Sequence, residues 1–325
     1  MDMITEYVAD GGRLVVQPGL GASGARIVWI DLLDPDRDEE ARVEQQLGIN
    51  VPTREDMEEI EISSRLFSED GALFMTAILP SQADGDDPEL LPVTFVLSKD
   101  TLVTIRYHRP RAFETFPARA AKVSMGCDTG EGVLVALLEA IVDRLADILE
   151  HDGREIDGIS RRIFRKSEEK VMKGADLQDV IEAIGRKGDL TSNIRDSLVT
   201  LERVAGFLGQ QTLQKKSPRD LRERIKTLSR DIRSLADHAS FLSQKITFLL
   251  DATLGLINIE QNAIIKIFSV AAVVFLPPTL IASIYGMNFE HMPELEWLLG
   301  YPFAIGLMIV SAILPFVYFK RRGWL

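Results

Sequence analysis

Sulfur ligands and basic charge are both scarce in this chain of 325 residues. The one cysteine, Cys127, cannot form an internal disulfide or a thiolate metal cluster, which fits a reducing compartment. Lysine and arginine number 37 against 49 acidic residues, so the formal net charge is -12. Nucleic-acid binding depends largely on basic side chains that contact phosphates, so this balance argues against a nucleic-acid partner. Cations are the expected partners of such a chain.

Signatures of enzymes and nucleotide-binding proteins are also missing. No glycine is followed by lysine, so there is no P-loop, and the four histidines lack the H-E-x-x-H or i, i+4 spacing of a zinc site. Gly19, Gly21 and Gly24 spell G-x-G-x-x-G, but they lead into a strand-like segment and not into a helix that would bind a pyrophosphate. We interpret these glycines as a loop, and we expect no catalysis, no nucleotide and no cofactor.

Long apolar runs are absent before Ile267, and two of them follow it. Residues 267–289 and residues 297–319 each form a run of 23 residues without a charge. About 20 apolar residues cross a hydrocarbon layer of about 30 Å, so we expect two transmembrane helices joined by a short loop. A buried helical hairpin of a soluble protein is the alternative. Residues 1–10 lack the basic and apolar pattern of a signal peptide.

Charges beside the two spans predict their orientation. The loop between them has three glutamates, Glu290, Glu294 and Glu296, and no lysine or arginine, whereas the second span leads directly into the basic residues 320–322. Because positive charge favours the cytoplasmic side, the tail belongs there. Two spans bring both termini to one side, so the first 266 residues are cytoplasmic too. We expect a multi-pass protein of the cytoplasmic (inner) membrane with its loop in the periplasm or extracellular space.

Residues 1–130 predict a cytoplasmic α/β domain. Runs rich in β-branched and aromatic residues indicate strands, and apolar residues at helical spacing lie between them. The expected strands are residues 26–32 and 73–79 and a hairpin over residues 93–107 that turns near Lys99 and Asp100, and the expected helices are residues 39–47 and 54–63.

Residues 131–216 predict a long antiparallel pair of helices, with Gly153 and Gly174 as interruptions. Ser217 and Pro218 then give a helix-start signal. The whole chain therefore predicts an α+β membrane protein. Its expected segments are the α/β domain, the helical pair, a very long stalk helix over residues 217–285 that becomes the first transmembrane helix at about residue 267, the loop 286–298, the second transmembrane helix 299–319 and the basic tail 320–325.

The stalk helix carries the most regular pattern in the chain, a heptad seam sustained over four repeats. Its members are Leu221, Ile225, Leu228, Ile232, Leu235, Ala239, Leu242, Ile246 and Leu249. A continuous helix from Leu221 to Tyr285 would be about 100 Å long. We expect the seam to hold copies of the chain in a bundle, because two spans alone cannot enclose a water-filled path.

The end of the first span and the end of the chain carry a resemblance to a known family. Tyr285-Gly286-Met287-Asn288 is followed by Met292-Pro293-Glu294-Leu295, and the basic tail ends in Trp324-Leu325. Together these motifs resemble the CorA family of magnesium transporters, densely from about Asp251 to the end of the chain and only in layout before it. The resemblance implies a homopentamer whose first spans line one axial pore, with magnesium as the transported ion.

Gly286, Met287 and Asn288 are then expected at the outer mouth of the pore. A ring of Asn288 amides would accept hydrogen bonds from the water shell that magnesium holds tightly. A helix C-cap is the alternative role of Gly-Met-Asn. Glu290 and Glu294 would concentrate cations there, unless they are only solvated loop acids. The family positions along the pore fall on Thr279, Leu276, Phe268, Ile265 and Asn262, whose three apolar members would form a dewetting constriction.

The resemblance also implies regulation by internal magnesium. Magnesium that bridges carboxylates between subunits would hold the bundle closed, and its loss would open the gate. Family position indicates Asp56 as one ligand, and Asp231 is the nearest match for its partner on the stalk. An ordinary solvated helix face is the alternative role of Asp56.

Two other functions remain open from the sequence. Zinc, cobalt and nickel transporters share this architecture, although Met287 favours magnesium because zinc-transporting relatives typically depart from Gly-Met-Asn at that residue. A membrane-anchored scaffold that does not conduct is the second alternative.

Overall fold

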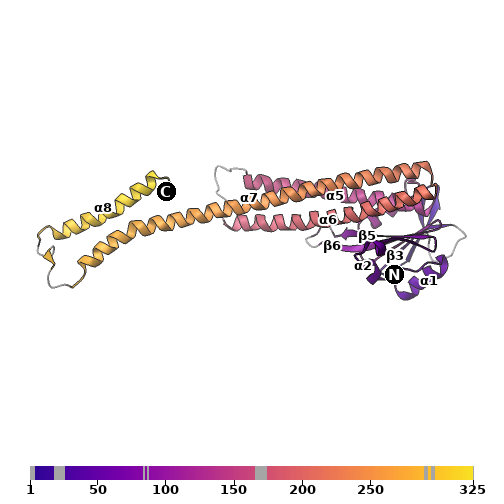
Figure 1. Ribbon diagram of the computed structural model, residues 1–325, viewed down its shortest axis with the longest axis horizontal. Coiled ribbons are helices and arrows are strands. Elements are labelled where there is room, and N and C mark those ends of the chain that lie inside the picture. The colour runs from indigo at the N-terminus through magenta and orange to yellow at the C-terminus, as the bar shows by residue number, and fades with distance from the viewer. Residues whose placement is uncertain are drawn as a thin grey trace. The chain divides into compact units, whose positions relative to one another are not determined.

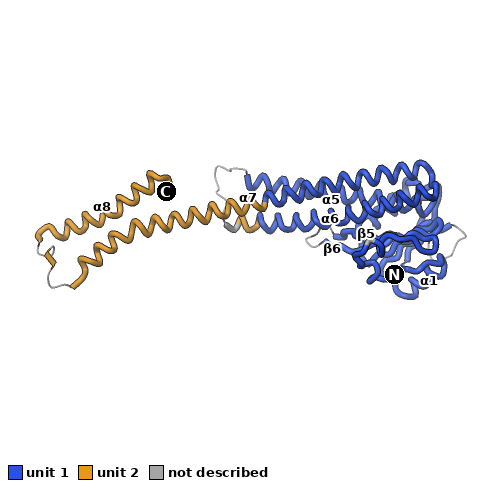
Figure 2. The backbone as a smooth tube through the Cα atoms, viewed as in Figure 1, with its two compact units in different colours: residues 1–167, 180–249 blue, residues 168–179, 250–325 orange. Residues whose placement is uncertain are grey.

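The computed structural model describes residues 4–17, 26–82, 85, 88–164, 174–288, 292–293 and 297–324. It confirms the predicted fold class, with an N-terminal α/β region, long helices and an apolar C-terminal hairpin (Figure 1). The chain forms two compact units (Figure 2). The first comprises residues 1–167 and 180–249, and the second comprises residues 168–179 and 250–325.

A seven-stranded mixed sheet organises the α/β region, in the order β2-β1-β3-β7-β6-β5-β4. All neighbouring strands are antiparallel except β3 and β7, which are parallel. The strands are β1 (Ile4–Asp10), β2 (Arg13–Gln17), β3 (Ile27–Leu33), β4 (Leu66–Glu69), β5 (Ala72–Ser81), β6 (Glu89–Ser98) and β7 (Thr101–Arg106).

The strands expected from the sequence correspond to β3, β5 and the hairpin β6–β7. Ser98 pairs with Thr101 across the hairpin, and Lys99 has the positive φ of 53° that a tight turn requires. β1, β2 and β4 were not predicted. The pairs of β1 with β2 and of β4 with β5 turn at Gly11–Gly12 and Asp70–Gly71, whose φ values are positive. The G-x-G-x-x-G glycines lie outside the described residues.

The short helices described beside the sheet are α1 (Arg37–Leu47), α2 (Arg54–Glu58), α3 (Ile62–Arg65) and α4 (Ala112–Ala120). The predicted helix 54–63 is therefore two helices, because the backbone turns extended at Glu59, with ψ 138°. Val43 of α1 and Met57 of α2 belong to one buried apolar cluster with strand residues such as Ile30 and Val103.

Three long helices follow, α5 (Gly130–Phe164), α6 (Gly174–Gln214) and α7 (Arg219–Tyr285), the last one of 67 residues. The predicted helical pair is confirmed as α5 and α6. Gly174 is the first residue of α6, but Gly153 lies inside α5 and does not interrupt it. Arg224 of α7 forms an ion pair of 2.7 Å with Glu139 of α5.

The heptad seam of α7 is buried within the single chain. Leu228, Ile232 and Leu249 are at most 3% exposed. Gly153 of α5 and Gly188 of α6 lie against the seam, since a Cβ at either position would make ordinary van der Waals contact, at 3.6 Å, with Leu242 and Ile246 respectively. The expectation that this seam joins copies of the chain is therefore wrong. The seam instead fastens α7 to its own helical pair.

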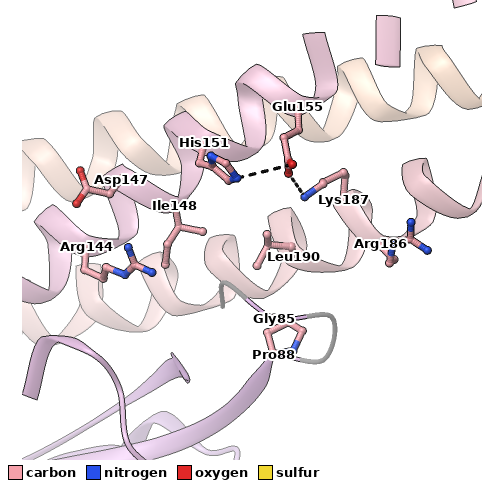
Figure 3. Close-up of a pocket in the computed structure, with 10 residues that line it drawn as sticks. All are labelled: Gly85, Pro88, Arg144, Asp147, Ile148, His151, Glu155, Arg186, Lys187 and Leu190. Atoms are coloured by element: carbon pink, nitrogen blue, oxygen red, sulfur yellow. Dashed lines mark ion pairs between the residues drawn. The ribbon is translucent and has the colours of Figure 1, made fainter. Parts of the chain in front are cut away.

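A buried polar cluster joins α5 to α6. The Asp152 side chain is completely buried, accepts a hydrogen bond of 2.7 Å from Thr191 Oγ1, and lies 3.4 Å from Lys187 Nζ. Lys187 also pairs with Glu155, one turn along α5 (Figure 3). Burial raises the pKa of Asp152, although Thr191 and Lys187 act against the shift. Lys187 thus compensates a buried carboxylate between the two helices.

Replacing this lysine should destabilise the helical pair in a pH-dependent way. In Lys187→Met the carboxylate of Asp152 loses its cation, so we expect a loss of about 2 kcal/mol at neutral pH. A carboxyl whose folded pKa is raised favours folding at low pH, and this contribution is lost as the pH rises through that pKa. The deficit in thermal midpoint, measured on the full chain in detergent, should therefore shrink between pH 7.5 and pH 5.

The matched control is Arg186→Met, because Arg186 is exposed on the same turn of α6. It should leave the midpoint unchanged at every pH. An equal deficit in Lys187→Met at both pH values would contradict the assigned role of Asp152.

Candidate ion pathway and metal sites

Within the described residues, two helices are long and apolar enough to cross a membrane, α7 and α8 (Gly300–Arg321). The second unit contains α8 and the part of α7 from residue 250 onward. In the most apolar stretch of each, 6% of the residues are buried within the chain. A hairpin in the core of a soluble protein would be mostly buried, so that alternative does not fit. Aromatic residues mark both ends of α8, with Trp297 against Phe303 at one end and Tyr318 against Phe319 at the other.

Helix α7 continues without a break through Pro277 and Pro278. These prolines have no N–H, so the carbonyls of Val273 and Val274 lack their usual donors inside the helix. One turn is reinforced in another way, because Thr279 Oγ1 donates a hydrogen bond of 2.7 Å to the Phe275 carbonyl. The Thr279 oxygen keeps lone pairs that accept further bonds.

One face of the α7 end lies towards α8. Val270 of α7 is 3% exposed and Ala304 of α8 is 8% exposed. A direct contact joins the two segments at one end of the hairpin, where Lys266 Nζ lies 5.9 Å from the centroid of the Trp324 ring. Half-buried residues continue this face of α7 at Val274, Pro277 and Ile281.

The expected pore-lining residues lie on the opposite side of α7. At 3.6 residues per turn they fall within about a third of the helix circumference, which we call the pore face. They are Asn262, Ile265, Phe268, Leu276 and Thr279. Ile265 is 60% exposed, Phe268 72% and Leu276 65%, so the single chain leaves this apolar face uncovered.

Gly-Met-Asn forms a tight end to α7. Gly286 N–H donates to the Ala282 carbonyl at 3.0 Å and Met287 N–H donates to the Ile284 carbonyl at 3.2 Å. The motif thus terminates α7, as the alternative of a helix C-cap predicts, but Gly286 does so without a left-handed conformation. A Cβ at Gly286 would lie 3.1 Å from the Ala282 carbonyl oxygen, and glycine permits this close approach. Asn288 is exposed directly after the turn, and Glu290 and Glu294 lie outside the described residues.

Asp56 has a structural role at the start of α2. Its Oδ2 accepts hydrogen bonds from the Thr53 backbone N–H at 2.9 Å and from Thr53 Oγ1 at 2.7 Å. Thr53 Oγ1 in turn accepts a hydrogen bond from the Asp56 N–H, and the two interactions together form a capping box. This cap was not predicted, although its signal is present in the sequence as Thr-x-x-Asp.

Asp231 lies on an exposed position of α7, near acidic residues of α5 in the same chain. Burial raises the pKa of Asp143, Arg119 opposes the shift, and the charge of Asp231 adds to it. Among the described residues, no group of three or more histidine, cysteine or acidic side chains is placed to hold a metal ion. Among the described residues of the single chain, Asp56 and Asp231 therefore form no shared metal site.

A cleft of about 410 Å³ lies between α5, α6 and the connection from β5 to β6 (Figure 3). Its lining contains both signs of charge, with Arg186 and Lys187 on α6 and Asp147 and Glu155 on α5. His151 Nε2 lies 3.7 Å from Glu155 Oε1. None of the predicted site residues lines this cleft.

These features define a membrane protein with two C-terminal spans, a large α/β domain and a continuous helix that connects them. The family model described as "CorA-like Mg2+ transporter protein" matches residues 24–321. The chain belongs to the CorA family.

Relatives in this family resemble the chain over most of its length. It is 39% identical over 298 residues to the magnesium transport protein CorA of Escherichia coli strain K12, and 38% identical to that of Salmonella typhimurium, covering 92% of each chain. The solved structure of the CorA magnesium transporter of Methanocaldococcus jannaschii matches all of this chain and 99% of its own, with a TM-score of 0.79 and 20% identity. The full-length CmaX protein matches with a TM-score of 0.68 and 14% identity.

Thiol labelling should separate the pore face from a lipid-facing surface. Cys127 is buried, and burial raises its pKa to about 11, so we expect this native thiol to react little when a second cysteine is introduced. We expect a water-soluble methanethiosulfonate to label Leu276→Cys in vesicles and to spare Leu314→Cys of α8. Both leucines are 65% exposed in the single chain, so only the assembly distinguishes them. Equal labelling of the two variants would contradict the pore face.

Proposed function

We propose that this chain is the subunit of a magnesium channel of the cytoplasmic membrane. The observation that carries the proposal is the exposed Asn288 directly beyond an unbroken apolar helix whose pore face is uncovered. The family and the 39% identity to a magnesium transport protein support the same ion. Both termini are cytoplasmic in this proposal, and the Gly-Met-Asn turn lies at the outer surface.

The channel is a homopentamer with five α7 helices around one axis. Two spans cannot enclose a pore, so several chains must contribute. Exposed apolar residues on the stalk part of α7 also support an assembly. Phe241 is 56% exposed, Phe248 59% and Ile259 66%. Large apolar side chains exposed in this number are typical of a surface that other copies cover.

The Asn288 ring selects the hydrated ion. Magnesium dehydrates reluctantly and keeps several of its waters, so amide oxygens that accept hydrogen bonds from these waters avoid most of the dehydration cost. Further in, Thr279 and Asn262 offer polar atoms, and Leu276, Phe268 and Ile265 form the apolar constriction that gates by dewetting. Glu290 and Glu294 raise the local concentration of cations at the mouth. Cobalt and nickel, which form similar hydrated ions, are the expected secondary substrates.

The membrane potential drives influx. A divalent cation gains about 4.6 kcal/mol on entering a cell that is 100 mV negative inside, enough for accumulation of about a thousandfold. An open pore would therefore overload the cytosol. Magnesium bound between subunits at Asp56 and at Asp231 supplies the control, because it offsets the repulsion between carboxylates and holds the pentamer closed.

Replacing Asn288 should impair selection of the hydrated ion. We expect Asn288→Ala to lower magnesium uptake by about tenfold or more, because each subunit loses an acceptor at the mouth. Uptake is measured with a magnesium-sensitive dye in liposomes that contain the purified protein. Gln210→Ala, which removes an exposed amide from α6, is the control and should conduct like the parent. Undiminished uptake by Asn288→Ala would refute the selectivity assignment.

A pair of variants can distinguish the two roles of Asp56, which are the capping of α2 and the binding of magnesium. Asp56→Asn removes the charge that would bind magnesium, so we expect uptake that internal magnesium inhibits less. Thr53→Val removes the hydroxyl of the capping box and keeps the carboxylate, so it should cost about 1 kcal/mol of stability and leave inhibition intact. Inhibition is measured with magnesium loaded inside the liposomes. If both variants lose inhibition equally, Asp56 acts only through the fold.

A further inference from the structure

Four basic side chains gather at the end of the hairpin where α8 ends. Lys266 belongs to α7, and Lys320, Arg321 and Arg322 close α8. We call these four residues the basic cluster. Two aromatic residues, Tyr318 and Trp324, accompany it.

The turn after α8 fixes the position of Trp324. Gly323 has a φ of 72°, its N–H donates to the Lys320 carbonyl at 3.2 Å, and the Trp324 N–H donates to the Phe319 carbonyl at 3.1 Å. This is the bond pattern of a Schellman cap, which reverses the chain after the last turn. The Trp324 ring therefore packs against the Phe319 ring in a tilted arrangement, with a centroid distance of 5.1 Å.

Aromatic rings hold two of the cations in place. Lys266 Nζ lies 5.9 Å from the Trp324 ring centroid, and the Arg322 guanidinium lies 5.4 Å from that of Tyr318. The first contact joins α7 to the tail, so the basic cluster is built from both helices. A cation over a ring keeps its outer side free for an anion.

The basic cluster is not neutralised within the described residues of the chain. None of its four members forms an ion pair there, although lysines and arginines elsewhere among those residues do, for example Arg224 and Lys187. Helix α8 contains no acidic residue, and the nearest acid before Lys266 along α7 is Glu260, about 9 Å away along the axis. This excess of positive charge stands out in a chain of net charge -12.

We propose that the basic cluster binds the phosphate headgroup of an anionic phospholipid in the cytoplasmic leaflet. Basic residues that directly follow a span attract anionic lipids, and tryptophan and tyrosine settle at the level of the headgroups. The neighbouring surface of α8 suits the acyl chains, because Leu314 is 65% exposed and Phe316 is 45% exposed. The proposal rests on the orientation in the proposed function, with the tail of the membrane hairpin in the cytoplasm, and not on magnesium transport.

Quenching by brominated lipids tests this site on the full chain. The protein is placed in phosphatidylcholine vesicles that contain equal fractions of brominated phosphatidylglycerol or brominated phosphatidylcholine. The chain has three tryptophans, so the Trp324 contribution is the difference between the parent and Trp324→Phe. We expect about fivefold enrichment of the anionic lipid at Trp324, and Lys266→Gln with Arg322→Gln should abolish it.

Two further variants serve as controls. Arg222→Gln with Lys226→Gln removes exposed bases from the opposite end of α7 and should keep the enrichment. Lys266→Arg keeps the charge and should also keep the enrichment. This variant therefore separates loss of charge from loss of folding.

Equal quenching by the two lipids in the parent would overturn the proposal. Enrichment that survives in the double Gln variant would also overturn it. Loss of the enrichment on addition of inorganic phosphate would overturn it too, because it would indicate that the site binds a free anion. A chain that shows the enrichment but does not conduct would refute only the transport function.

Discussion

Helix α7 is covered along one side by its own chain and uncovered along the other. In the cytoplasmic segment, α5 and α6 bury its heptad seam, and in the apolar segment a single face lies towards α8. The remaining face carries Ile265, Phe268 and Leu276, all at least 60% exposed. Because the covered side is already packed, only the uncovered side is available for other copies of the chain. In the proposed pentamer, the residues that face the axis must therefore come from the uncovered side.

Charge is distributed along the chain in a way that suits passive entry of a cation. The three loop glutamates and the three bases of the tail cancel, so the whole of the -12 belongs to the residues before the first span. In the proposed channel, a cytoplasmic domain with this excess would attract the entering ion and would be stabilised when the ion binds. The same electrostatics that favours entry would then provide a feedback signal once the ion accumulates.

Much of the fold could be predicted because its signals are periodic. The two uncharged runs, the heptad seam and the β6–β7 hairpin each depend on spacing alone. What covers the seam could not be predicted, since an apolar stripe looks the same whether its partner is another chain or α5 and α6. The Asp56 cap could have been found, because Thr-x-x-Asp is a local signal. The contact of Lys266 with Trp324 could not, because it depends on how two distant segments pack.

A neutral amide at position 288 suits conduction better than a carboxylate would. In the proposed pentamer, a ring of five acids would bind a divalent cation tightly and compete with its water for the metal. An ion held so strongly would leave slowly, and conduction requires binding that is weak enough for release. Amide oxygens accept hydrogen bonds from the bound water without a net charge, so recognition comes from geometry and not from Coulomb attraction. The acids of the loop are then free to raise the local ion concentration without trapping the ion in the pore.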